Sequence, residues 1–183
     1  MQDQQIIESV RHWVDTLIVG MNLCPFAKRE LVKERVRFLV SPATDEAQLL
    51  AILTVELERL NRDPAIETTL LIHPQALTDF YDFNQFLNQA DDLLIEMGME
   101  GIFQIASFHP DYQFGGTEPD DAENYTNRSP FPVLHLLREA SLERAIANYP
   151  DVDKIPDHNI ALMESLGTDK LKAIMHSCLH RPA

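Results

Sequence analysis

Cys24 is the side chain whose surroundings in the sequence most strongly suggest chemistry. It lies in the stretch MNLCPFAKRE, between an apolar helical pattern and Pro25. Proline is favoured at the first position of a helix, so Cys24 is expected near an N-cap, where backbone N–H groups and the helix dipole stabilise a thiolate. Lys28 and Arg29 add positive charge one turn further on. The alternative interpretation is a small buried hydrophobic side chain at a helix corner.

His109 and Asp111 form a second candidate pair, in the segment FHPDYQFGG. An imidazole and a carboxylate at the end of a strand can act as general base and orienting group, or as metal ligands. A structural histidine bonded to a backbone carbonyl is the alternative. The following segment, up to Pro132, is long and irregular, and such segments are usually functional or disordered. Because it contains aromatic residues and paired glycines, we favour a functional loop.

The same segment contains charged side chains that could bind a ligand. Glu118, Asp120, Asp121 and Glu123 could hold a divalent cation or a cationic substrate group, and a solvated acidic loop explains them equally well. Arg128 could hold a carboxylate, including a haem propionate, or pair with these acids.

The remaining histidines and the second cysteine are weaker candidates. His73 also follows an expected strand but has no acidic neighbour in the sequence. His135 lies in an apolar run and is expected to be a satisfied core or boundary histidine. His176, Cys178 and His180 have the residue types of a metal site, but their spacing matches no established zinc motif.

Three short apolar or β-branched runs alternate with longer helical patterns, as in βαβ units. The expected strands are residues 36–40, 68–72 and 102–108, and helices are expected at about 4–21, 45–60, 78–97, 133–149 and 157–179. The sequence therefore predicts one α/β domain over residues 1–183. We expect a small, mainly parallel sheet of three or slightly more strands flanked by helices, with a long functional loop and two C-terminal helices.

Each expected strand ends in an X-Pro step: Ser41-Pro42, His73-Pro74 and His109-Pro110. Parallel strands place their carboxyl ends at one edge of a sheet, where ligands of open α/β folds gather. Two of these strand ends carry a histidine, so we expect a site at this edge.

Composition excludes several classes of function. The formal net charge of −14 disfavours nucleic acid and acidic membrane surfaces as partners. The N-terminal stretch lacks a signal-peptide pattern, and no apolar run is long enough to span a bilayer. Two distant cysteines without an export signal indicate cytosolic thiols, so we expect a cytoplasmic protein. We also expect its partner to be a small-molecule substrate. No Walker A, G-x-G-x-x-G, G-x-S-x-G, C-x-x-C or H-E-x-x-H motif occurs. The sequence leaves the oligomeric state open.

Two segments resemble a known family: NLCPFA near the N-terminus and FHPDYQFGGTEPDDAENYTNRSPFPVLHLLRE in the second half. They are similar to an uncharacterised bacterial family defined only as a domain of unknown function. The resemblance covers nearly the whole chain and implies no established activity.

Shorter motifs are also similar to haem-dependent oxygenase-like proteins, which include enzymes that hydroxylate guanidine nitrogens. These motifs are Cys-Pro-Phe, a later Phe-His-Pro, and Arg-Ser-Pro-x-Pro before a helix. This resemblance implies haem as cofactor and a small nitrogen-containing substrate. It would make Cys24 the thiolate ligand of the iron, with Phe26, His109 and Arg128 around the haem or the substrate. A haem-thiolate needs a sheltered, electropositive sulfur, which a cysteine at a helix start could provide.

Four hypotheses remain open. The first is a haem-thiolate oxygenase with Cys24 as axial ligand. The second is a cofactor-free thiol enzyme with Cys24 as nucleophile, His109 as base and Asp111 as orienting group. The third is a non-haem metal enzyme that uses His109, Asp111 and acids of the 118–123 loop. The fourth is a non-catalytic redox or haem sensor.

Overall fold

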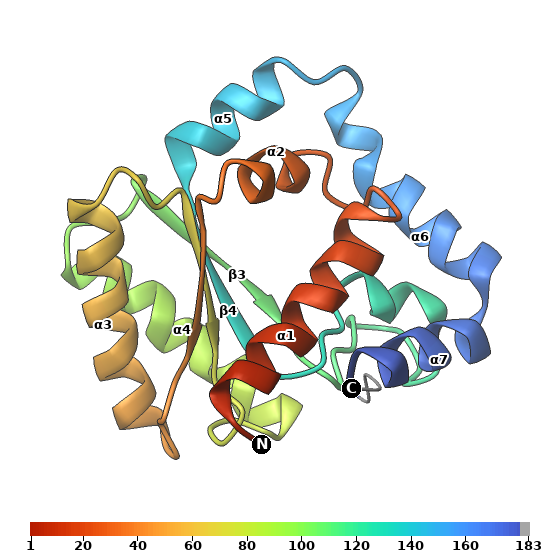
Figure 1. Ribbon diagram of the computed structural model, residues 1–183, viewed down its shortest axis with the longest axis horizontal. Helices are drawn as coiled ribbons and strands as arrows, with labels where there is room; N and C mark the ends of the chain where they lie inside the picture. The colour runs from red at the N-terminus through yellow and green to blue at the C-terminus, as the bar shows by residue number, and fades with distance from the viewer. Residues whose placement is uncertain (180–183) are drawn as a thin grey trace.

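A mixed sheet forms the centre of the protein (Figure 1). The computed structural model describes residues 1–179, and the sheet of this part of the chain has the order β1-β2-β4-β3. β1 and β2 are parallel, and β4 is antiparallel to both of its neighbours, so β1, β2 and β3 all run in one direction. The strands are β1 (Val36–Val40), β2 (Thr68–Ile72), β3 (Phe103–Phe108) and β4 (Val133–Arg138).

The central strand β4 corrects the sequence-based expectation of three mainly parallel strands and a helix at 133–149. Residues 133–138 are a strand, and only α5 (Glu139–Ala147) is helical in that range. Every residue of β4 is buried or half-buried, so its run VLHLLR is nearly continuous in apolar residues, and leucine also favours helices. Periodicity cannot separate a fully buried strand from a short buried helix. The expected last helix is two helices, α6 (Ile155–Leu166) and α7 (Thr168–Leu179), separated by Gly167 with φ +76°.

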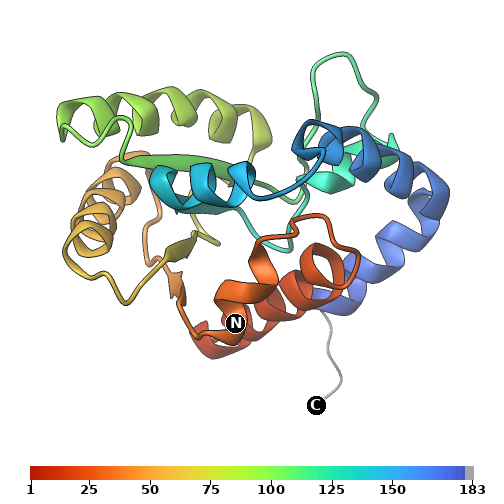
Figure 2. The same cartoon turned by 90° about the horizontal axis from the view of Figure 1, so that it is seen from above.

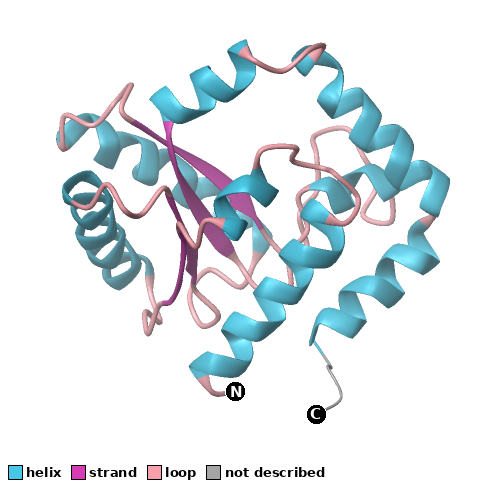
Figure 3. Ribbon diagram, turned by 45° about the horizontal axis from the view of Figure 1, so that its top comes forward, coloured by secondary structure: helices cyan, strands magenta, loops and turns pink. Residues whose placement is uncertain are grey.

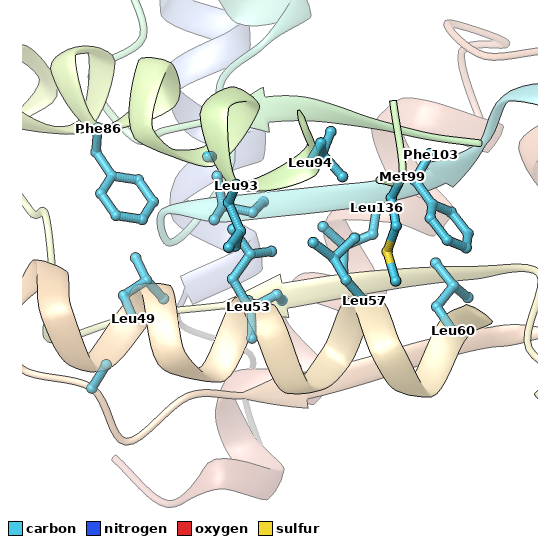
Figure 4. Close-up of a cluster of buried hydrophobic side chains, with 14 of the residues drawn as sticks. Leu49, Leu53, Leu57, Leu60, Phe86, Leu93, Leu94, Met99, Phe103 and Leu136 are labelled. Atoms are coloured by element: carbon cyan, nitrogen blue, oxygen red, sulfur yellow. The ribbon is translucent and has the colours of Figure 1, made fainter. Parts of the chain in front are cut away.

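One face of the sheet is covered by α3 (Glu46–Arg62) and α4 (Phe80–Glu96). Both helices begin at a capping aspartate: Asp45 accepts the N–H of Gln48, and Asp79 accepts the N–H of Tyr81. Figure 4 shows leucines three or four residues apart on α3 that point toward α4 and the sheet. These leucines are Leu49, Leu53, Leu57 and Leu60, all fully buried. Such burial stabilises the layer by roughly 2 kcal/mol per leucine.

The other face carries α1 (Asp3–Trp13), which continues through the π-helical turn η1 (Val14–Val19), and α7 packs against α1 on the side away from the sheet (Figure 1). Figure 2 shows the same arrangement from above. Alternation along β2 separates the two cores, since Leu71 packs toward α3 and α4 while Leu70 and Ile72 pack toward α1. The short helix α2 (Ala27–Val32) lies on the α1 side of the sheet, as Figure 3 also shows. In the described part of the chain, no helix is both long and apolar enough to cross a membrane.

Candidate functional site

The carboxyl ends of β1, β2 and β3 lie at one edge of the sheet, which confirms the expected convergence of the three X-Pro steps. The last residues of these strands are paired in a row, with the first residue of β4 between β2 and β3. This row consists of Val40, Ile72, Val133 and Phe108. The next residues, which include His73 and His109, therefore form one layer at that edge.

His73 and His109 are both fully buried against Phe83 of α4. Their ring centroids lie 5.6 and 5.1 Å from that of Phe83. His73 donates Nδ1–H to the carbonyl oxygen of Ala76 at 2.9 Å, and His109 donates Nε2–H to that of Leu77 at 3.2 Å. The two imidazoles thus hold consecutive carbonyl groups of the turn that leads into α4. Leu77 has φ +54°, a left-handed conformation that costs a leucine about 1 kcal/mol or more, so these bonds stabilise a strained turn.

Both imidazoles are neutral at pH 7. Burial lowers the pKa of His73 to about 4, although the hydrogen bond to the Ala76 carbonyl acts in the opposite direction and raises it. Burial also lowers the pKa of His109, although the bond to Leu77 and the nearby Asp111 and Asp79 carboxylates raise it. Nδ1 of His109 accepts the backbone N–H of Asp111 at 3.0 Å, so both of its ring nitrogens are bonded to backbone groups. This arrangement matches the structural alternative for His109 more closely than the base with Asp111 as orienting group.

A cavity of about 550 Å³ opens to solvent at the same edge, between the N-termini of α3 and α4. The strained turn contributes Gln75, Leu77 and Thr78 to its wall. Four carboxylates also line it: Asp45, Glu46, Asp79 and Asp82. Because Asp45 and Asp79 cap the two helices, they are engaged with backbone N–H groups.

Cys24 lies on the α1 side of the sheet, in the turn between η1 and α2. The neighbouring Leu23 belongs to the core under α1. Asn159 of α6 donates to the carbonyl oxygen of Leu23 at 2.9 Å. Helix α2 begins at Ala27 and not at Pro25. Burial raises the pKa of the Cys24 thiol, and bonds from the backbone N–H groups of Phe26 and Ala27 oppose this shift only in part. The structure therefore does not support the expected low-pKa thiolate.

The residues proposed around a haem are not brought together. Phe26, two residues after Cys24, makes an edge contact at 5.5 Å with Tyr149, which lies between α5 and α6, whereas His109 packs against Phe83 of α4 on the other face. Arg128 is engaged inside its own loop. It donates to the carbonyl oxygens of Tyr112 at 3.2 Å and Pro119 at 2.6 Å. Cys24 lines neither the 550 Å³ cavity nor a second cavity of about 280 Å³ between α1, α2 and β1, and the separation of Cys24, His109 and Arg128 does not fit one haem site.

The acidic segment is tied down by local contacts. Asp120 pairs with Lys172 of α7 at 2.7 Å, and Asp121 accepts the N–H of Glu118 at 2.8 Å. Among residues 1–179, no group of three or more histidine, cysteine or acidic side chains is placed to hold a metal ion. In the tail, Cys178 is buried in α7 and His176 lies on the same helix, while His180 falls outside the described residues.

His135 is the residue whose importance the sequence did not indicate. It lies in the middle of β4, and its Nε2 is 2.7 Å from Oγ1 of Thr68 on β2. The Thr68 hydroxyl donates to the carbonyl oxygen of Leu136 at 2.5 Å, so its oxygen must accept the Nε2–H of His135. Nδ1 therefore carries the lone pair. Burial lowers the pKa of His135 to about 4, so the ring is neutral.

Nδ1 of His135 has no partner in the described chain. Unlike Nε2 of His73, which is sealed in the core without a partner, it is not closed off from solvent. The ring is half-buried although β4 is an interior strand, because its cross-strand neighbour on β3 is the short Ala106. Gln104 and Phe108 lie on the same face of β3, on either side of Ala106. We call this surface the open face: Gln104, Ala106, Phe108, His135 and Leu137.

One signal could have identified the open face. If residues 133–138 had been recognised as a strand, His135 would have shared a face with Val133 and Leu137 and not with the leucines beside it. Its partner Thr68, 67 residues away, is not visible in any local pattern.

The comparison with curated proteins gave no match, and neither did the comparison with solved structures. The similarity to haem-dependent oxygenases therefore gains no support from them. A family model matches residues 5–173, and the chain accordingly belongs to the family described as "Protein of unknown function (DUF1415)".

Proposed function

We propose that this protein binds a small nitrogen-containing molecule on the open face, where an N–H group of the ligand donates to Nδ1 of His135. The observation that carries the proposal is the hydrogen-bond chain from His135 through Thr68 to the Leu136 carbonyl. This hydrogen-bond chain orients the imidazole and keeps the proton on Nε2. In many sites, the ligand-binding nitrogen of a histidine is set in the same way, by a hydrogen bond that the other ring nitrogen makes to a neighbouring residue.

The pKa of His135 decides between two roles for this ring. A general base works best when its pKa lies near the working pH. Burial lowers the pKa of His135 below its usual range, so the ring is neutral at pH 7. We therefore assign it the role of a permanent hydrogen-bond acceptor that positions an N–H group, and not that of a proton shuttle.

The surroundings of His135 favour a compact, partly apolar ligand. Phe108 lies 6.3 Å from the His135 ring, centroid to centroid, and Gln104 adds one exposed amide. The open face has no charged side chain of its own. The proposed ligand class is the one that the resemblance to haem-dependent oxygenases implies, but the proposal involves no haem.

Nitrogen-15 NMR of the histidine rings tests the proposal. In the free protein we expect His135 as the Nε2–H tautomer between pH 5.5 and 8. Titration with imidazole, formamide or methylguanidine should shift Nδ1 of His135, and tetramethylammonium, which has no N–H group, should not shift it. Thr68→Val should release the tautomer preference, while His158→Gln on exposed α6 serves as the control.

An Nδ1–H tautomer in the free wild-type protein would refute the proposal. So would an Nδ1 resonance that none of the three N–H probes moves.

A further inference from the structure

A second cavity lies between α1, α2 and β1, on the same side of the sheet as the open face. It has a volume of about 280 Å³ and is lined by Arg11, Leu31, Glu34 and Val36. It is more enclosed than the cavity at the carboxyl edge. Its wall combines one guanidinium group, one carboxylate and two aliphatic side chains.

The two charged groups of this cavity are unpaired. In the part of the chain that the structure describes, neither Arg11 nor Glu34 makes an ion pair or a side-chain hydrogen bond. The neighbouring arginines differ, since Arg35 pairs with Glu30 and Glu67, and Arg37 pairs with Glu56 at 2.9 Å. The donors of Arg11 and the oxygens of Glu34 are therefore both available to a ligand.

Arg11 is nevertheless held in place. Its guanidinium carbon lies 4.0 Å from the centroid of the Phe38 ring, in a cation–π contact. Such a contact occupies the face of the guanidinium and leaves its N–H edge free, and this edge matches a carboxylate through two parallel bonds. Glu34 lies two residues after the end of α2, and its backbone has φ +55°.

We propose that this cavity binds a small zwitterion, an α-amino acid, with the ligand carboxylate on Arg11 and the ligand ammonium on Glu34. The opposite charges of the two groups disfavour ligands with a single charge, because one protein charge would then stay unpaired. Leu31 and Val36 provide an apolar contact for the ligand side chain. The site goes beyond the proposed function, because it shares no residue with the open face.

NMR of the Leu31 and Val36 methyl groups provides a local test. Glycine, L-alanine, L-leucine and L-glutamine are titrated separately into the wild-type protein, with acetate and methylammonium as singly charged probes. We expect saturable shifts of both methyl groups with at least one amino acid, and none with acetate or methylammonium at the same concentrations.

Variants then identify the charges that matter. Arg11→Gln and Glu34→Gln should each weaken amino-acid binding by roughly tenfold or more. The matched control is Arg62→Gln, which removes a positive charge from the exposed Arg62–Glu58 pair on α3 and should leave binding unchanged. Because Arg11 and Glu34 are exposed, the variants should fold, and their thermal midpoints check this. The proposal is overturned if no amino acid shifts either methyl group, if acetate or methylammonium gives the same shifts, or if either variant binds like the wild type.

Discussion

Acid should destabilise this protein in part through His73, whose neutral ring is buried directly after β2. The pKa of His73 falls from 6.5 to about 4 on folding, so the unfolded chain takes up its proton first as the pH decreases. Stability is therefore lost below about pH 6.5 and levels off below about pH 4. At pH 4.5, His73 alone should have lowered the free energy of unfolding by about 2.5 kcal/mol relative to pH 7.5.

Urea unfolding at both pH values measures this effect, with fluorescence of the single, buried Trp13 as the probe. The comparison is with His73→Phe, which keeps an aromatic ring against Phe83 but cannot be protonated. His73→Phe loses the bond to Ala76, so it should be less stable than the wild type at pH 7.5. The wild type should lose about 2.5 kcal/mol more of its free energy of unfolding than His73→Phe between pH 7.5 and pH 4.5. The advantage of the wild type should therefore become smaller at pH 4.5, or the variant should become the more stable protein. A gap that stays constant between the two pH values would refute the reasoning, and His158→Gln controls for loss of an exposed histidine.

Two further predictions concern single side chains. Because burial raises the pKa of the Cys24 thiol, iodoacetamide should alkylate Cys24 at pH 7.5 more slowly than it alkylates a free cysteine in a peptide. The alkylation rate should still increase above pH 9. Rapid alkylation at neutral pH would restore the thiol-enzyme hypothesis. Arg138 donates to the carbonyl oxygens of Leu60, Asp63 and Ile66. Arg138→Lys keeps the charge but not the planar group, and should lower the free energy of unfolding by about 2 kcal/mol in urea titrations; an unchanged midpoint would contradict this.

The elements that the sequence predicted correctly are those with local signals. The helices α3 and α4 have a repeated apolar stripe and a capping aspartate, and β1 and β2 are short β-branched runs that end before proline. The convergence of His73 and His109 at one edge followed from parallel strand direction alone. In each case the physical cause lies within a few residues of the feature.

The features that the sequence did not predict depend on distant contacts. β4 is a strand because β2 and β3 pair with it on both sides, which a run of leucines cannot indicate. The position of Cys24 before a helix was visible, but the burial that raises its pKa comes from packing between distant segments. His135 was expected to be a satisfied core or boundary histidine; it is half-buried, and only one of its two ring nitrogens has a partner among the described residues.

The place of β4 in the sheet also has a consequence for how the chain assembles. Among the four strands of residues 1–179, β4 is synthesised last, yet it lies between β2 and β3. Until residues 133–138 are available, β3 has no neighbour and β2 has one unpaired edge. We therefore expect the sheet to close in one late step. Chains that stop before β4 should expose the unpaired edges of β2 and β3, which can pair with other chains and cause aggregation.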